Sequence, residues 1–321
     1  MERKTAADFD QELLILFDAY VHGAIDRRGF LDKAKKFAVG GVTSAMLLDA
    51  LNPKFAEAQQ VAKDDKRISG EYVEFSSPNG YGRMRGYMVR QASGGGAAVD
   101  AEAAKSRSGS AQMAADRRQR VPVVLVVHEN RGLNPHIEDI ARRLALEGFV
   151  AFAPDALFPL GGYPGDEDKA REQFGKLDQA KTREDFIAAA GFLKGQPQSN
   201  GRVGVVGFCY GGGMAHFLST RIPDLAAAVP FYGNTPAPEE AAKVKAPLLI
   251  HFAEKDDRIN AAWPAYEAAL KENKVNYQAY TYPGTQHGFN NDTTPRYDEA
   301  AAKLAWSRTI QFFQKHLFQS S

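Results

Sequence analysis

A chain of 321 residues with 44% hydrophobic and 25% charged residues can bury one large core, but it is short for two full domains. With a formal net charge of +1, the charge balance does not indicate binding to nucleic acid or to an acidic membrane surface. No apolar run reaches the roughly 18 residues of a membrane span. The single cysteine excludes an intramolecular disulfide and a two-cysteine redox cycle.

The first 58 residues carry the marks of a twin-arginine export signal. Two arginines within residues 26–33, DRRGFLDK, precede a Phe-Leu pair, and a moderately apolar run follows over residues 37–48. Small residues then predict a cleavage position after Ala58. If this segment is a signal, we expect the protein in the periplasm or outside the cell. If it is not, we expect the protein in the cytoplasm.

A helical extension that stays attached is the alternative for residues 1–58. Apolar residues recur there at helical spacing and could dock on the body: Phe9, Leu13, Leu14 and Phe17. On either interpretation, residues 59–321 form the main domain.

The body begins with a predicted hairpin. Residues 71–76 and 84–90 have strand character and flank a turn-rich linker, SPNGYG, which favours an antiparallel hairpin at a sheet edge. Residues 92–120 are rich in Gly, Ala and Ser, with scattered charges and no apolar periodicity. This composition predicts a flexible, solvated insertion.

Strands and helices alternate through the remainder. The continuous apolar run of residues 121–128, VPVVLVVH, is typical of a central parallel strand with helices on both faces. Further strands are expected over residues 149–153, 203–206, 226–231, 248–252 and 277–282, and helices over residues 137–147, 184–194, 264–273 and 300–317. The alternation predicts a doubly wound, mostly parallel sheet with ligands at the carboxyl ends of its strands.

A strand, a sharp turn and a helix surround the cysteine. The turn, Gly207-Phe208-Cys209-Tyr210-Gly211, has the spacing of the G-x-S-x-G nucleophile elbow, with Cys209 in place of serine. Glycines on both sides leave room for a strained turn, and backbone N–H groups at the helix start favour a thiolate or an oxyanion. A buried structural cysteine is the alternative interpretation.

An acid and a histidine follow the last two predicted strands. Asp256 and Asp257 come after one strand and His287 after the next, so nucleophile, acid and histidine have the chain order of an α/β-hydrolase triad. We expect His287 to accept the thiol proton and Asp256 to fix its tautomer. Asp257 is the competing acid, but its neighbour Arg258 predicts a surface ion pair.

These residues resemble the dienelactone hydrolase family, the carboxymethylenebutenolidase-like branch of the α/β hydrolases. The resemblance runs from about residue 72 to the C-terminus, outside the insertion, and its marks are GFCYGG at 207–212, HENRG at 128–132 and GTQHGF at 284–289. It implies an α/β-hydrolase fold and a cysteine nucleophile.

The resemblance also implies roles for two charged residues. Glu129 stands where the family has a glutamate that interacts with the thiol, and Arg171 where an arginine binds the substrate's carboxylate. An ion pair from Glu129 to Arg131 or Arg171 is the alternative. Gly175 and Asn291 occupy the places of a tyrosine and a second arginine of the family, which leaves the substrate open.

The predicted function is hydrolysis of a small-molecule ester or lactone by a Cys209, His287, Asp256 triad through a covalent acyl-enzyme. The backbone N–H groups of Tyr210 and Asn130 are predicted to form the oxyanion hole. No cofactor is expected, and no metal, because histidines 128 and 136 match no compact zinc pattern. The alternatives are a general carboxylesterase, a peptidase-like hydrolase, a single-cysteine redox protein and a scaffold without turnover. Monomer and homodimer both fit.

Overall fold

In residues 4–92 and 120–318, which the computed structural model describes, eight strands form one sheet. Their order is β1-β2-β4-β3-β5-β6-β7-β8. Their bounds are β1 Ile68–Ser77, β2 Gly82–Gln91, β3 Val121–Val127, β4 Val150–Pro154, β5 Ser199–Phe208, β6 Ala227–Phe231, β7 Leu248–Lys255 and β8 Tyr277–Gln286. β2 pairs antiparallel with β1 and β4, and the other pairings are parallel. The predicted mostly parallel sheet with an antiparallel edge hairpin is confirmed.

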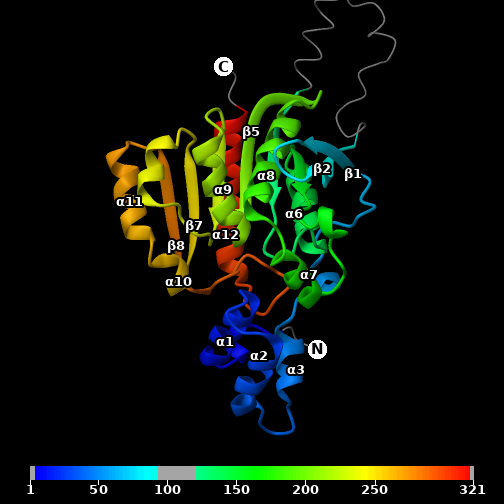
Figure 1. Ribbon diagram of the computed structural model, residues 1–321, viewed down its shortest axis with the longest axis vertical. Helices are drawn as coiled ribbons and strands as arrows, with labels where there is room; N and C mark the ends of the chain where they lie inside the picture. Colours follow the sequence, from blue (N-terminus) through cyan, green and yellow to red (C-terminus); the bar gives the residue numbers. More distant parts are fainter. Residues whose placement is uncertain (1–3, 93–119, 319–321) are drawn as a thin grey trace, which may run out of the picture.

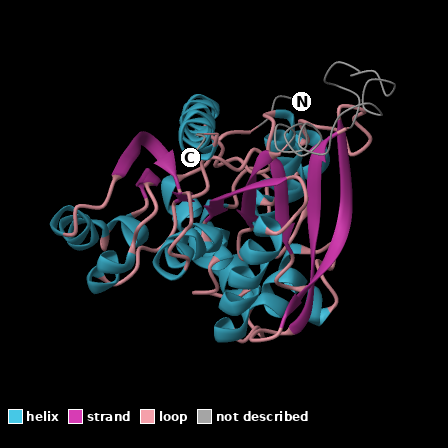
Figure 2. Cartoon of the chain, turned by 90° about the horizontal axis from the view of Figure 1, so that it is seen from above, coloured by secondary structure: helices cyan, strands magenta, loops and turns pink. Residues whose placement is uncertain are grey.

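Helices cover both faces of this sheet (Figure 1 and Figure 2). They are α6 Pro135–Leu146, α7 Glu167–Phe174, α8 Gln179–Lys194, α9 Tyr210–Arg221, α10 Asp257–Asn260, α11 Trp263–Glu272 and α12 Glu299–Leu317, with short 3-10 segments at η4 Phe158–Leu160 and η5 Pro238–Lys243. Side chains alternate across a strand, so Val123 and Leu125 of β3 pack in the same cluster as residues of α8, α9 and α11, whereas Val124 and Val126 pack with α6 and α12. The central strand is therefore apolar on both faces, as its sequence predicts.

Residues 4–58 form what we call the N-terminal arm, a small helical unit. Its elements are η1 Ala6–Asp8, α1 Gln11–Val21, α2 Arg27–Ala34, η2 Lys35–Phe37, α3 Ser44–Leu51 and α4 Phe55–Ala58. One apolar face of α1 packs against α2 and α3 in a core separate from that of the body, formed by Leu13, Leu14, Phe17, Tyr20, Phe30, Ala34, Leu48 and Leu51. Figure 1 shows the arm beside α7 and α10, at the edge of the sheet where the parallel strands end.

The segment that follows the arm is fastened to α6. The Asp139 carboxylate accepts hydrogen bonds from the backbone N–H groups of Gln60 and Val61, at 3.1 and 2.9 Å. The Arg142 Nε atom donates to the Val61 carbonyl at 2.8 Å. Asp139 and Arg142 are buried and hydrogen-bonded to each other, which holds this segment on the body.

Two further sequence predictions concern the insertion and a membrane span. The predicted insertion over residues 92–120 lies, apart from its two end residues, outside the described residues. No helix within residues 4–92 or 120–318 combines the length and the apolar character needed to cross a membrane.

The turn after β5 is strained and tightly packed. Cys209 has φ +55° and ψ −112°, an uncommon conformation for a residue with a side chain. A Cβ atom on Gly207 would lie 1.9 Å from the Gly211 carbonyl oxygen, and one on Gly211 would lie 2.2 Å from the Val127 carbonyl oxygen. These glycines let three backbone segments approach closely enough to hold the cysteine at the apex.

We expect Gly211→Ala to lower the free energy of unfolding by about 1–3 kcal/mol, the usual cost of overpacking. Gly213→Ala is the matched control, because its Cβ would meet nothing closer than 3.5 Å and alanine favours the helix that contains it. Thermal unfolding followed by circular dichroism compares the two variants. Equal midpoints would contradict a steric role for Gly211.

Candidate active site

Cys209 lies at the N-terminal end of α9, directly after β5. Its backbone N–H donates to the Phe231 carbonyl at 3.1 Å, which ties the turn to the end of the neighbouring strand β6. The residue is only 9% exposed. The thiol therefore sits beneath other side chains, at the carboxyl end of the sheet where the sequence predicts the site.

His287 and Asp256 meet beside it. Asp256 follows β7 and His287 follows β8, and these two strands are parallel neighbours. The His287 Nδ1–H group donates to Asp256 Oδ2 at 2.5 Å, and both side chains are buried. Asp257, the competing acid, is exposed at the start of α10. The structure therefore pairs His287 with Asp256, the acid that the sequence favours.

The ring of His287 turns its second nitrogen toward the cysteine. His287 Nε2 lies within 4.8 Å of Cys209 Sγ and finds no hydrogen-bond partner among the described residues, although it is buried. A short movement would bring the two atoms into contact.

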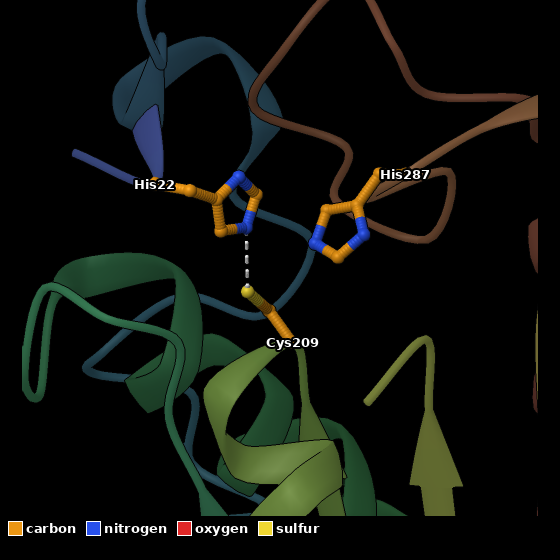
Figure 3. Close-up of side chains that lie close together, drawn as sticks. All are labelled: His22, Cys209 and His287. Carbon is orange, nitrogen blue, oxygen red and sulfur yellow. Dashed lines mark hydrogen bonds between the residues drawn. The ribbon is translucent and has the colours of Figure 1, made fainter. Parts of the chain in front are cut away.

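A second histidine, which no sequence pattern indicated, reaches the same thiol. His22 follows α1 of the arm, and its Nε2 atom lies 3.3 Å from Cys209 Sγ (Figure 3). Its Nδ1–H donates to the Asp18 carbonyl at 2.9 Å and lies 3.3 Å from the Asp18 carboxylate. The His22 and His287 rings are edge to face, with centroids 4.7 Å apart. The thiol is thus flanked by one imidazole from the arm and one from the body.

The electrostatics of this cluster favour a thiolate. Burial raises the pKa of Cys209, but the charges of His287 and His22 and the hydrogen bond to His22 outweigh burial and lower that pKa to about 6. Burial lowers the pKa of His287, but the Cys209 thiolate and the Asp256 carboxylate raise it to about 10. Between these values the stable form is a thiolate beside an imidazolium.

Arg171 binds the arm in this structure. Its Nη1 atom donates to the Tyr20 carbonyl at 2.7 Å, and its guanidinium lies 4.3 Å from the centroid of the Tyr20 ring. The next carbonyl, of Val21, accepts from Asn130 Nδ2 at 3.0 Å and Arg131 Nη2 at 3.2 Å. The C-terminal end of α1, which carries a partial negative charge, therefore occupies the basic side of the site.

Glu129 is engaged elsewhere. Its Oε2 atom accepts a hydrogen bond from Asn291 Nδ2 at 2.9 Å. Among the described residues, Arg131 pairs with Glu167 at 3.5 Å and Arg171 with Asp168 at 3.8 Å, so neither forms the suggested ion pair with Glu129. The coupling of Glu129 to the thiol stays a prediction.

Two backbone N–H groups remain for an oxyanion. Tyr210 opens α9, and Asn130 lies in the loop after β3. Within the part of the chain that the structure describes, neither N–H group donates a hydrogen bond to a backbone carbonyl. Their predicted role in the oxyanion hole stays a prediction that this arrangement allows.

Arg258 contacts another residue than the one that the sequence predicts. The sequence predicts an ion pair with Asp257, but no such ion pair occurs in the described residues, and Arg258 Nη2 lies 3.2 Å from His22 Nε2.

Histidines 128 and 136 contact other residues than the thiol. His128 forms hydrogen bonds with the backbone of the loops after β3 and β4, and His136 lies 3.2 Å from Asp292.

Comparison with known proteins agrees with the fold. The model of the Dienelactone hydrolase family matches residues 110–317, and a model described as YqhI-like matches residues 1–39. The chain is 43% identical over 137 residues to "Putative hydrolase fragment YghX" of Escherichia coli (strain K12), which covers 43% of this chain and 97% of that protein. It is 32% identical over 228 residues to a "Putative carboxymethylenebutenolidase" of Saccharolobus solfataricus, covering 60% of this chain and 88% of that one.

A solved structure points to the same family. The crystal structure of a "Putative Dienelactone Hydrolase" from Klebsiella pneumoniae superposes with a TM-score of 0.61 at 26% sequence identity, over 77% of this chain and 99% of the other. The family model spans more than half of the 321 residues. The chain therefore belongs to the dienelactone hydrolase family, as its motifs predict, and is a hydrolase that acts on esters or lactones.

Proposed function

We propose that the protein hydrolyses a small ester or lactone through a Cys209, His287, Asp256 triad with a covalent acyl-enzyme. The observation that carries this proposal is the buried His287–Asp256 pair, at 2.5 Å, whose free Nε2 atom lies beside a cysteine on a strained elbow. The bond to Asp256 fixes the proton on Nδ1 and leaves Nε2 to exchange protons with the thiol.

The reaction then has two halves. The Cys209 thiolate attacks the carbonyl carbon, and the tetrahedral oxyanion collapses as His287 gives its Nε2 proton to the departing alkoxide. An ester releases its alcohol in this step, whereas a lactone opens and keeps the new hydroxyl on its acyl group; either substrate forms an acyl-cysteine. His287 next takes a proton from a water molecule that attacks this thioester, so that the acid is released and the thiolate and imidazolium are restored. The N–H groups of Tyr210 and Asn130 would each stabilise the oxyanion by roughly 3 kcal/mol.

We infer that the substrate carries an anionic group. The sequence retains one of the family's two substrate-binding arginines, yet Arg131 lies beside Arg171, and both donate to carbonyl oxygens at the end of α1. These oxygens, with their partial negative charge, stand in for a substrate carboxylate. Substrate therefore binds when the segment from Tyr20 to His22 is displaced.

Three substitutions test the triad. We expect Cys209→Ala to abolish hydrolysis of p-nitrophenyl acetate or a small lactone, and Asp256→Asn to lower kcat by about two to four orders of magnitude. Asp257→Asn is the matched control and should change kcat less than about twofold, because this carboxylate is exposed. Unchanged turnover of Cys209→Ala, or equal effects of the two asparagine variants, would refute the assignment.

The pH dependence tests the charge state of the thiol. In a profile of kcat/KM we expect an acid limb near pH 6, where the thiolate is protonated, and an alkaline limb near pH 10, where His287 loses its proton. The titratable groups that interact with the thiol are His22, His287, Arg131 and Tyr232, with Arg258 beside His22 and with Asp18 and Asp256 behind the imidazoles. His22→Ala removes a neighbouring positive charge, so the acid limb should move to higher pH.

Alkylation by iodoacetamide, followed by intact mass, measures the same titration without substrate because the chain has one cysteine. A midpoint near the ordinary thiol pKa of about 8.5 in the wild type would contradict the thiolate state. An acid limb that does not move in His22→Ala would contradict the contribution of His22.

A pair of esters tests the anionic substrate. Arg171→Ala should raise KM for an ester that bears a carboxylate at least tenfold, since a charge-assisted hydrogen bond is lost. The matched neutral ester should change little by comparison. Steady-state kinetics on both esters makes the measurement, and a similar loss on both would argue against recognition of a carboxylate.

A further inference from the structure

We propose that Cys209, His22 and His287 form a binding site for a thiophilic divalent cation such as Zn²⁺, and that the bound cation locks the arm over the nucleophile and stops hydrolysis. The ligand atoms are the Sγ atom and the two Nε2 atoms, which all lie within 4.8 Å of one another (Figure 3). One thiolate and two imidazoles are a donor set that Zn²⁺ prefers. The three ligands leave a fourth coordination position for water.

The distances suit a tetrahedral ion. Bonds of about 2.3 Å to sulfur and 2.1 Å to nitrogen place tetrahedral ligand atoms about 3.4–3.6 Å apart. His22 Nε2 is already 3.3 Å from Cys209 Sγ. The His287 Nε2 atom is buried, faces the cluster and has no hydrogen-bond partner among the described residues. Adjustments of an ångström or less by this ring and the thiol would complete the site.

Both imidazoles are oriented as metal ligands usually are. Each holds its Nδ1 proton in a hydrogen bond, His287 with Asp256 Oδ2 at 2.5 Å and His22 with the Asp18 carbonyl at 2.9 Å. The Asp18 carboxylate lies a further 3.3 Å from the His22 ring nitrogen. Bonds of this kind fix the tautomer, so that the cation binds at Nε2 in place of the proton that an imidazolium carries there. The two carboxylates also offset part of the cation's charge.

One neighbouring charge opposes the site. Arg258 Nη2 lies 3.2 Å from His22 Nε2, where its positive charge opposes a cation on the same nitrogen. The arginine side chain is exposed, so it can turn into solvent. A cavity of about 600 Å³ between α1 and the loops after β7 and β8 is lined by Arg258, Asp256 and His287 among others, so it reaches one of the three ligands.

A bound cation would affect hydrolysis in two ways. It occupies the sulfur and the His287 lone pair, which the proposed reaction needs as nucleophile and base. It also joins the arm, through His22, to the body, through Cys209 and His287. The cation therefore inhibits, and a chelator restores, activity. Binding itself does not depend on the proposed hydrolysis and is measured without substrate.

Cobalt titration of the full-length protein tests the site. We expect one Co²⁺ to bind, with a thiolate-to-cobalt charge-transfer band and the intense visible bands of a tetrahedral ion, and Zn²⁺ to displace it. His22→Ala should weaken binding at least tenfold, and Cys209→Ser should remove the charge-transfer band. Arg258→Ala should tighten binding, because it removes the competing cation. His316→Ala, on the last turn of α12, is the control and should leave the affinity unchanged.

Inhibition supplies the second readout. Zn²⁺ should inhibit ester hydrolysis reversibly, and His22→Ala should need at least tenfold more Zn²⁺ for the same inhibition. A missing charge-transfer band, or a cobalt affinity unaffected by both His22→Ala and Arg258→Ala, would overturn the site. Cobalt binding with undiminished hydrolysis would overturn the inhibition. If no ester is hydrolysed, the proposed function fails while the cobalt spectrum still decides the site.

Discussion

The site depends on a negative charge held in a place that is almost closed to water. A thiolate that is 9% exposed is unstable unless cations face it, and here two imidazoles do so. One is held by Asp256 and the other by Asp18, so the charges alternate from carboxylate to imidazole to sulfur. The elbow fixes the sulfur in position because close backbone contacts around its glycines allow the strained φ at Cys209. The residue with the strained backbone is therefore also the residue that carries the thiolate.

Local pattern was enough to predict most of the body. Continuous apolar runs mark the parallel strands because both faces of each are covered, and every predicted strand occurs with bounds shifted by a few residues. α7 was missed, since its sequence EDKAREQF has only two buried residues and almost no apolar stripe. The chain order of nucleophile, acid and histidine placed Asp256 and His287 side by side, because parallel strands end at one edge.

The contacts between the arm and the active site are not predictable from the sequence. Its helical spacing was visible, but Leu13, Leu14 and Phe17 pack in the arm's own core, and the docking residues carry no periodic signal. His22 reaches Cys209 across 187 positions of sequence, and the Tyr20 and Val21 contacts use backbone carbonyls that any residue supplies. Asn291 stands where the family has an arginine, and nothing in the sequence predicts that its amide donates to Glu129. Tertiary contacts of this kind leave no local pattern.

The hydrogen bonds that hold residues 60 and 61 on α6 bear on the predicted cleavage after Ala58. Asp139 and Arg142 form hydrogen bonds with the backbone of Gln60 and Val61, which lie two and three positions after Ala58. Cleavage after Ala58 would leave both residues in the mature chain. A chain trimmed after Ala58 would thus keep its new terminus pinned to the sheet's covering helix. It would also lose the imidazole and the two carbonyls that shield the sulfur. Removal of residues 1–58 would therefore uncover the thiol without releasing the segment that is held on α6.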